Sequence, residues 1–125
     1  MRALLSTAPG GPETLTLSEL PDPVAGRGQV VIAVKACAIN FPDVLIIEDK
    51  YQFKPERPFA PGGEIAGIVA EVGDGVEGWA VGDRAIAMLG HGGLSEKVVA
   101  DPAKLYRLPE AVSYTHLTLP TKRIV

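Results

Sequence analysis

Side chains that could do chemistry gather in two short segments of this sequence, residues 36–43 and residues 61–67. The first carries a cysteine, an amide and a carboxylate, and the second carries Glu64 after paired glycines. A catalytic zinc needs about three ligands drawn from thiolate, imidazole and carboxylate. Asn40 and the paired glycines are not among these ligand types. The amide of Asn40 can instead orient a carbonyl group by hydrogen bonding, without titrating.

Cys37 and His91 are further candidates, and both also have a simpler interpretation. Cys37 lies in an apolar run and far in sequence from both histidines, which is typical of a small buried residue. The alternative is a nucleophile or a metal ligand. His91 lies among glycines, where we expect a solvated loop tip. Its alternative role is an acid or base that lines a site.

Residues 73–78 match the dinucleotide fingerprint G-x-G-x-x-G and follow a predicted strand. That motif binds pyrophosphate only where its last glycines open a helix. Here Gly82-Asp83 would stop such a helix almost at once, and a crossover connection needs roughly a dozen residues. We therefore predict a tight turn between two strands, with no cofactor bound there.

Composition limits the classes of partner. The chain has 125 residues, enough for one domain with a core, and a net charge of −3 without a long block of either sign. This balance does not favour nucleic acid or an anionic membrane as a partner. No apolar run approaches the roughly 20 residues that span a bilayer, and the start of the chain resembles a strand rather than a signal peptide. Since a single cysteine suits a reducing compartment, we expect a soluble, cytoplasmic protein.

Short β-branched runs, separated by 14 glycines and 11 prolines, predict a mainly β domain, either a barrel or a sandwich. The expected strands are residues 2–7, 14–20, 29–39, 65–72, 84–89, 94–100 and 104–108. One segment breaks the pattern, because Phe41, Val44 and Leu45 recur at helical spacing. Asn40 before them, with a proline in the first turn, resembles a helix start. We expect one short helix across an end of the barrel, then an exposed loop over residues 49–57.

Six motifs occur in order along residues 1–111, and together they resemble the N-terminal, GroES-like domain of medium-chain dehydrogenase/reductases. The motifs are Asn40-Phe41-Pro42-Asp43, Asp49-Lys50-Tyr51, Pro61-Gly62-Gly63-Glu64-Ile65-Ala66-Gly67, Val72-Gly73-Asp74-Gly75-Val76, Val81-Gly82-Asp83-Arg84 and Gly92-Gly93-Leu94-Ser95-Glu96. Zinc alcohol dehydrogenases of this family carry a cysteine at the position of Asn40 and a histidine at that of Gly63. The most similar branch is therefore the zinc-independent NADPH:quinone oxidoreductases.

The resemblance implies a GroES-like, partly open β-barrel that forms one wall of a cleft. A separate Rossmann domain would hold NADPH and supply the contacts of a homodimer. Matched by position, Asn40 and Tyr51 would lie near the nicotinamide and the substrate as catalytic residues. The residues that would line or support the same cleft are Phe41, Asp43, Glu64, Gly92 and Gly93. The implied reaction is hydride transfer from NADPH to a quinone or an α,β-unsaturated carbonyl (enone), without zinc or any other metal.

Two alternatives remain open at this point. An enoyl or acryloyl thioester reductase would share the zinc-free barrel and the use of NADPH. A non-catalytic, GroES-like binding module would share only the barrel.

The last 14 residues, 112–125, depart from the family pattern and resemble a translated sequencing adapter. Segments of this origin are set aside in reasoning about a fold. We therefore expect a GroES-like domain over residues 1–111 and a non-native tail over residues 112–125. We also expect that the parent enzyme is truncated before its Rossmann domain, and that this fragment is inactive alone.

Overall fold

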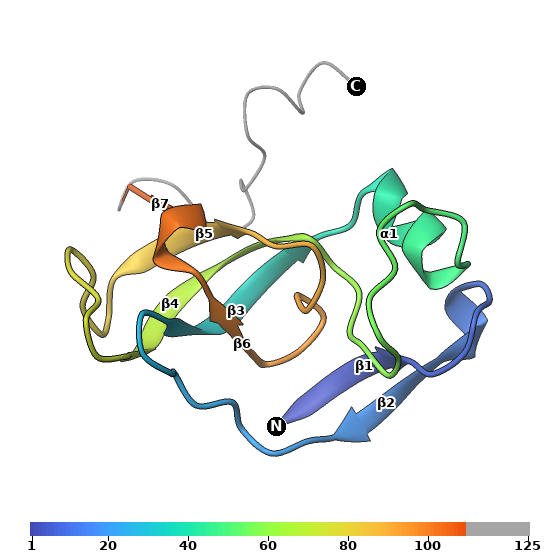
Figure 1. The fold of residues 1–125 in the computed structure, drawn as a ribbon, viewed down its shortest axis with the longest axis horizontal. Helices are drawn as coiled ribbons and strands as arrows, with labels where there is room; N and C mark the ends of the chain where they lie inside the picture. The colour runs from blue at the N-terminus through green and yellow to red at the C-terminus, as the bar shows by residue number, and fades with distance from the viewer. Residues whose placement is uncertain (110–125) are drawn as a thin grey trace.

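The computed structural model describes residues 1–109, which form two antiparallel sheets and one short α-helix (Figure 1). The strands are β1 (Arg2–Ser6), β2 (Leu15–Glu19), β3 (Val30–Ala38), β4 (Glu64–Val72), β5 (Arg84–Met88), β6 (Lys97–Ala100) and β7 (Leu105–Arg107). The helix is α1 (Phe41–Ile47), and two 3-10 turns, η1 (Pro12–Thr14) and η2 (Pro102–Lys104), add to the elements expected. The mainly β class with one short helix is confirmed. The tail expected over residues 112–125 lies outside the described residues.

The two sheets face each other without closing into a full barrel. Strands β1 and β2 form a hairpin, and the other strands form a sheet in the order β6-β3-β4-β5-β7. Two isolated bridges tie β1 to the segments that lead into β6 and β4, between Ala3 and Ser95 and between Ser6 and Phe59. The segment before β6 runs along β1 rather than extending the strand, so β6 begins later than the sequence predicted. The partly open barrel is thus confirmed.

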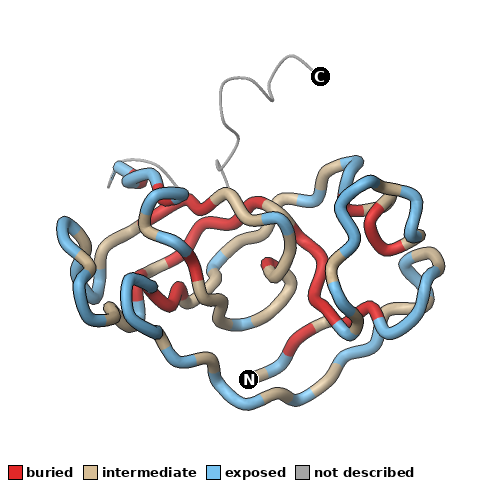
Figure 2. Tube along the Cα trace, in the orientation of Figure 1, coloured by how far each residue is buried: buried red, intermediate tan, exposed pale blue. Residues whose placement is uncertain are grey.

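The core lies along β3 and β4, the longest strands of the sheet. Val30, Ile32, Ile65 and Val69 on these strands are all 0% exposed and pack in one cluster. Residues 59–62, which lead into β4, are also buried. Figure 2 shows this buried segment passing between the two sheets. Core packing therefore fixes residues 59–62, the segment that carries Gly62 and leads to Gly63 and β4.

Helix α1 begins where the sequence predicted. Asn40 is the N-cap, and its backbone N–H donates to Oδ2 of Asp43 at 2.7 Å, one arm of a capping box. The apolar face differs from the expected one, because Phe41 is 73% exposed while Ile46 and Ile47 are buried. The reason is a tertiary contact, because the side chains of Ile46 and Ile47 pack against Phe59.

The G-x-G-x-x-G segment is a turn, as predicted. Strands β4 and β5 are antiparallel neighbours, and residues 73–83 between them contain no helix. Gly73 is required by close packing, since an added Cβ would lie 2.0 Å from the carbonyl oxygen of Gly26. The segment cannot present a helix N-terminus to a pyrophosphate.

Candidate functional site

A hollow of about 190 Å³ lies between the start of α1, the loop that follows the helix and the end of β5. We call it the Asn40 pocket. Its lining residues are Asn40, Pro42, Asp43, Ile46, Tyr51, Phe53, Gly63, Met88, Leu89 and Gly90. The fold therefore brings together three of the residues predicted from the sequence, an amide, a carboxyl and a phenol, from separate segments.

The capping box fixes one side of the Asn40 pocket. Asp43 is 6% exposed, and its backbone N–H donates to the carbonyl oxygen of Asn40 at 3.0 Å. Together with the bond from the Asn40 N–H to the carboxylate, this holds both residues in a single turn. Asn40 thus has a defined backbone position at the rim of the pocket, which is what a residue that orients a ligand needs.

The loop over residues 49–57 forms the opposite side and turns back on the helix. Asp49 has a left-handed φ of 61°, and the next N–H, of Lys50, donates to the carbonyl oxygen of Leu45 at 2.9 Å. This turn directs Tyr51 back against the cluster formed by Ile46, Ile47 and Phe59. Tyr51 is consequently half-buried.

Arg57 fastens the far end of the same loop. Its guanidinium donates to the carbonyl oxygen of Ile47 at 2.9 Å and to Oγ of Ser6 at 3.2 Å. Ser6 is fully buried, and Ile47 ends α1, so one side chain ties loop, helix and β1 together. The prediction of an exposed loop is wrong at this residue, because a cation near a helix C-terminus satisfies carbonyl groups that the helix leaves unpaired.

Gly63 forms the floor of the Asn40 pocket, where β4 and β5 approach closely. Its carbonyl oxygen accepts a hydrogen bond from the Leu89 N–H at 2.6 Å. An added Cβ would lie 2.8 Å from the Leu89 carbonyl oxygen and 3.7 Å from Oδ1 of Asp43. A histidine here would require the backbone to move. Among residues 1–109, no three side chains of His, Cys, Asp or Glu are grouped to hold a metal ion. The residues present do not fit a zinc site.

Four other predicted cleft residues are not among the lining residues of the Asn40 pocket. Glu64 is 1% exposed within β4, and Phe41 projects outward at the surface. Gly92 lines a hollow on the β1 side of the barrel. Gly93 lines a separate hollow with Cys37. That these four residues line or support a cleft shared with a second domain stays a prediction.

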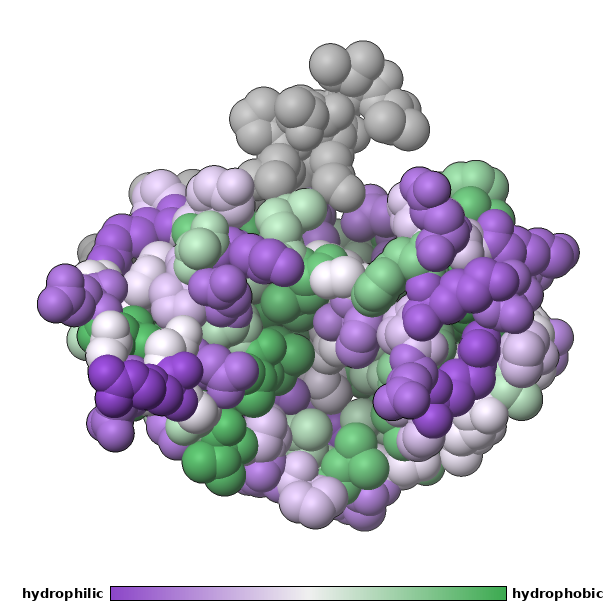
Figure 3. Space-filling view, in the orientation of Figure 1, coloured by the Kyte–Doolittle hydropathy of each residue, from purple (hydrophilic) through white to green (hydrophobic). Residues whose placement is uncertain are grey.

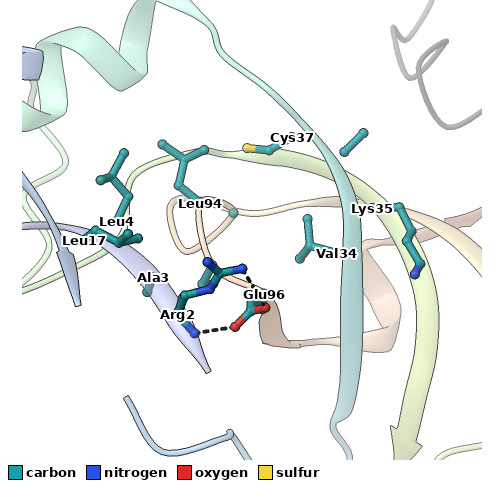
Figure 4. Close-up of a pocket in the computed structure, with 12 residues that line it drawn as sticks. Arg2, Ala3, Leu4, Leu17, Val34, Lys35, Cys37, Leu94 and Glu96 are labelled. Carbon is teal, nitrogen blue, oxygen red and sulfur yellow. Dashed lines mark hydrogen bonds and ion pairs between the residues drawn. The ribbon is translucent and has the colours of Figure 1, made fainter. Parts of the chain in front are cut away.

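The hollow beside Cys37 measures about 340 Å³ and lies between β1, β3 and residues 93–96 (Figure 4). We call it the Cys37 hollow. Figure 4 shows Cys37 near Leu94, with the ion pair between Arg2 and Glu96 on the opposite side. The two charged groups of that pair lie 3.8 Å apart, and both side chains are exposed.

Cys37 itself is closely packed. A Cβ added at Gly62 or at Gly93 would lie 2.7 Å or 2.8 Å from Sγ. Burial, and then the charges of Asp43 and Glu64, raise the pKa of the Cys37 thiol to about 11. The thiolate is the nucleophile and the metal ligand, so a thiol protonated at neutral pH is unsuited to either role. The interpretation as a small packed residue is supported.

His91 is not the solvated residue that its glycine-rich segment predicted. Its ring stacks on Phe53, with centroids 5.8 Å apart and an interplanar angle of 20°. It also meets Phe59 edge-on at 5.6 Å. Burial lowers the pKa of His91. The sequence could not reveal this, because the covering ring comes from a distant loop.

Sequence reasoning also missed part of the pocket lining, namely Phe53, Met88, Leu89 and Gly90. One usable signal was present, an apolar ring in an otherwise charged loop. Figure 3 shows apolar surface gathered at the hollowed centre of this face of the molecule.

Among the described residues, no helix has the length and apolar character needed to cross a bilayer.

Comparison with known proteins agrees with this fold. Residues 26–110 match the family described as Alcohol dehydrogenase GroES-like domain, and the chain belongs to that family. A curated relative, quinone oxidoreductase-like protein 2 homolog of Nematostella vectensis, is 45% identical over 91 residues, 72% of this chain and 25% of the relative. The resemblance to quinone oxidoreductase-like members of the medium-chain dehydrogenase/reductases is thus confirmed.

Two solved structures extend the comparison. Human synaptic vesicle membrane protein VAT-1 homolog-like protein superposes with a TM-score of 0.90 at 32% identity, covering 94% of this chain and 38% of that one. Escherichia coli quinone oxidoreductase, complexed with NADPH, gives a TM-score of 0.88 at 30% identity, covering 94% and 36%. This chain therefore spans well under half the length of its relatives.

Proposed function

We propose that this chain is the substrate-side domain of an NADPH-dependent, zinc-independent quinone oxidoreductase, and that Asn40 and Tyr51 contact the reacting molecules. The observation that carries the proposal is the Asn40 pocket. An amide, a phenol and a buried carboxyl converge there on an apolar floor, and the relatives include quinone oxidoreductases. That arrangement suits a small, uncharged carbonyl acceptor.

The size of the Asn40 pocket supports a division of labour with a second domain. Its volume of about 190 Å³ is below the roughly 300–1,000 Å³ of pockets that enclose a drug-sized ligand, so it suits a ligand of about one ring. A whole dinucleotide does not fit, so NADPH would be held mainly outside this chain. When bound, NADPH supplies the hydride. We accordingly expect no turnover from this chain alone.

Each polar residue of the Asn40 pocket has a distinct task. The Asn40 amide can donate to a carbonyl oxygen, or accept from a carboxamide, in any ordinary pH range. The Tyr51 hydroxyl can donate to the oxygen of the acceptor. Asp43 keeps the turn in place through its bond to the Asn40 N–H. Apolar Ile46 and Met88 help to exclude water, which strengthens the hydrogen bonds made inside.

Zinc independence is supported by the packing at Gly63. The carbonyl oxygen of Leu89 occupies the approach that an imidazole at this position would need. Activation of the acceptor must then come from hydrogen-bond donors and from the electron-poor character of the acceptor itself. A quinone or an enone meets that requirement because it is conjugated.

The test uses the full-length protein, with and without a metal chelator, and compares a benzoquinone, an enone and an enoyl thioester as acceptors. We expect NADPH oxidation that depends on the quinone or enone, persists in chelator and occurs without stoichiometric zinc. Activity lost in chelator and restored by zinc would contradict the metal-free assignment. A strong preference for the thioester would replace the quinone assignment with that of a thioester reductase.

A further inference from the structure

Phe53 lines both the Asn40 pocket and a second, larger hollow. This outer hollow measures about 470 Å³, and it shares Phe53, Leu89 and Gly90 with the Asn40 pocket. Its remaining lining residues are His91, Val99, Ala100, Asp101 and Lys104. The outer hollow is thus partly apolar, with charged groups available to a polar end of a ligand.

Core packing supports the Phe53 ring from behind. Phe53 stacks on His91, and His91 packs edge-on against Phe59, which is 4% exposed and belongs to a core cluster. On the other side, a Cβ added at Gly90 would lie 3.0 Å from Cε2 of Phe53. The ring fills the space that this glycine leaves. It is nevertheless 43% exposed and sits on a loop, so removing it disturbs little of the core.

We infer that Phe53 is a specificity-determining residue, which limits the ligand of the Asn40 pocket to about one ring. This inference rests on the proposed function for the identity of that ligand as a carbonyl acceptor. Without the Phe53 ring, the Asn40 pocket and the outer hollow would become continuous. A second ring of the ligand would then enter the outer hollow, beside His91.

The test measures Kd values by NMR titration of the 125-residue chain with phenol and with 4-phenylphenol. Both probes carry the hydroxyl of a reduced quinone without its reactivity, and they differ by one ring. We expect the wild-type chain to favour phenol and Phe53→Ala to favour 4-phenylphenol, with the ratio of Kd values changing by about tenfold or more. Tyr106→Ala, at an exposed ring in β7, is the matched control and should leave the ratio unchanged.

A second pair of variants tests the support behind the ring, should Phe53→Ala fold poorly. His91→Ala removes the stacking partner and should shift the ratio in the same direction by a smaller factor. His91→Phe keeps a stacked ring and should preserve the wild-type ratio. An unchanged ratio in both Phe53→Ala and His91→Ala would overturn the inference, as would a failure of both probes to bind any of these chains.

Asn40→Ala distinguishes this inference from the proposed function. If Asn40→Ala weakens phenol binding while Phe53→Ala leaves the ratio unchanged, the role of Phe53 is overturned and the Asn40 pocket stands. If Asn40→Ala leaves phenol binding unchanged while Phe53→Ala shifts the ratio, Phe53 does separate the two hollows. The assignment of Asn40 as a ligand contact then fails.

Discussion

The Asn40 pocket and the Cys37 hollow use two adjacent glycines in different ways. A side chain at Gly62 would meet Sγ of Cys37, whereas one at Gly63 would meet the Leu89 carbonyl oxygen, close to Asp43. Yet the two hollows differ in chemical capacity. The first gathers an amide, a phenol and a carboxyl that can hydrogen-bond to a ligand, and the second holds a thiol whose pKa is raised to about 11, chiefly by burial. The Cys37 sulfur therefore stays a protonated, weakly nucleophilic thiol at neutral pH.

The difference teaches that closeness in sequence to a family motif does not define a site. Cys37 and Asn40 are near neighbours in the chain, but one lies in β3 and the other caps α1. Cys37 packs against the core and against Gly62 and Gly93, while the cap opens onto a loop. The following changes test whether the two regions are as distinct as this comparison claims.

The largest effect on stability is expected at Gly62. Its φ of 101° is left-handed, and an added Cβ would lie 2.7 Å from Sγ, so Gly62→Ala combines backbone strain with overpacking. We expect a loss of about 3 kcal/mol in the free energy of unfolding, measured by urea denaturation. Gly75→Ala is the control, since Gly75 has a φ of 84° but open space around it. It should cost about 1 kcal/mol. Equal losses in the two variants would mean that Gly62 and the Cys37 sulfur are not tightly packed against each other.

A smaller loss is expected on the other side of the comparison, at Arg57. Arg57→Ala removes the hydrogen bonds to the Ile47 carbonyl and to the buried Ser6 hydroxyl. We expect a decrease of about 2 kcal/mol in the free energy of unfolding. Arg57→Lys should recover only part of it, because an ammonium cannot reproduce the planar fork. Full recovery with lysine would show that charge alone fastens the loop beside the Asn40 pocket.

Reactivity of Cys37 should reveal its protonation. Because burial raises the thiol pKa from 9.0 to about 11, we expect the folded chain to react with a disulfide reagent at neutral pH about a hundredfold more slowly than the unfolded chain. The folded state also keeps its proton at higher pH than the unfolded state. Stability should therefore fall as pH rises from about 9 to about 11, and Cys37→Ala should remove that slope. Fast reaction of the folded chain would contradict the packed thiol.

The smallest effect is expected at His91. Burial holds its pKa below the ordinary value, so the unfolded chain takes up a proton first as pH falls. The free energy of unfolding should then decrease as pH falls below about 6.5. His91→Phe retains a stacked ring and should lose this part of the slope. An identical slope in that variant would assign the titration to other groups.

Much of the fold could be predicted because local signals agreed with the tertiary structure. Alternating β-branched runs marked the strands, and Asn40 with a proline marked the start of α1. The buried face of α1 could not be predicted in the same way. Ile46 and Ile47 face inward because Phe59 lies there, and no spacing within the helix reports that partner.

The candidate site could be predicted only in part, for a similar reason. Asn40, Asp43 and Tyr51 belong to motifs of the family, and the fold does bring them together. The rings of Phe53 and His91 stack because two loops distant in sequence pack together, so neither residue type nor spacing could predict this contact. The position of the Phe53 ring between the two hollows depends on this tertiary packing, and no local sequence pattern reports it.

The most direct test of the account compares Asn40→Ala with Cys37→Ala in the full-length protein, with a benzoquinone as acceptor and thermal melting to verify folding. Loss of a ligand hydrogen bond predicts that Asn40→Ala lowers kcat/KM about tenfold. Cys37→Ala should stay near the wild-type value, because its thiol touches neither reactant. An Asn40→Ala enzyme that folds and turns over at the wild-type rate would show that Asn40 only caps α1, and the account would fail.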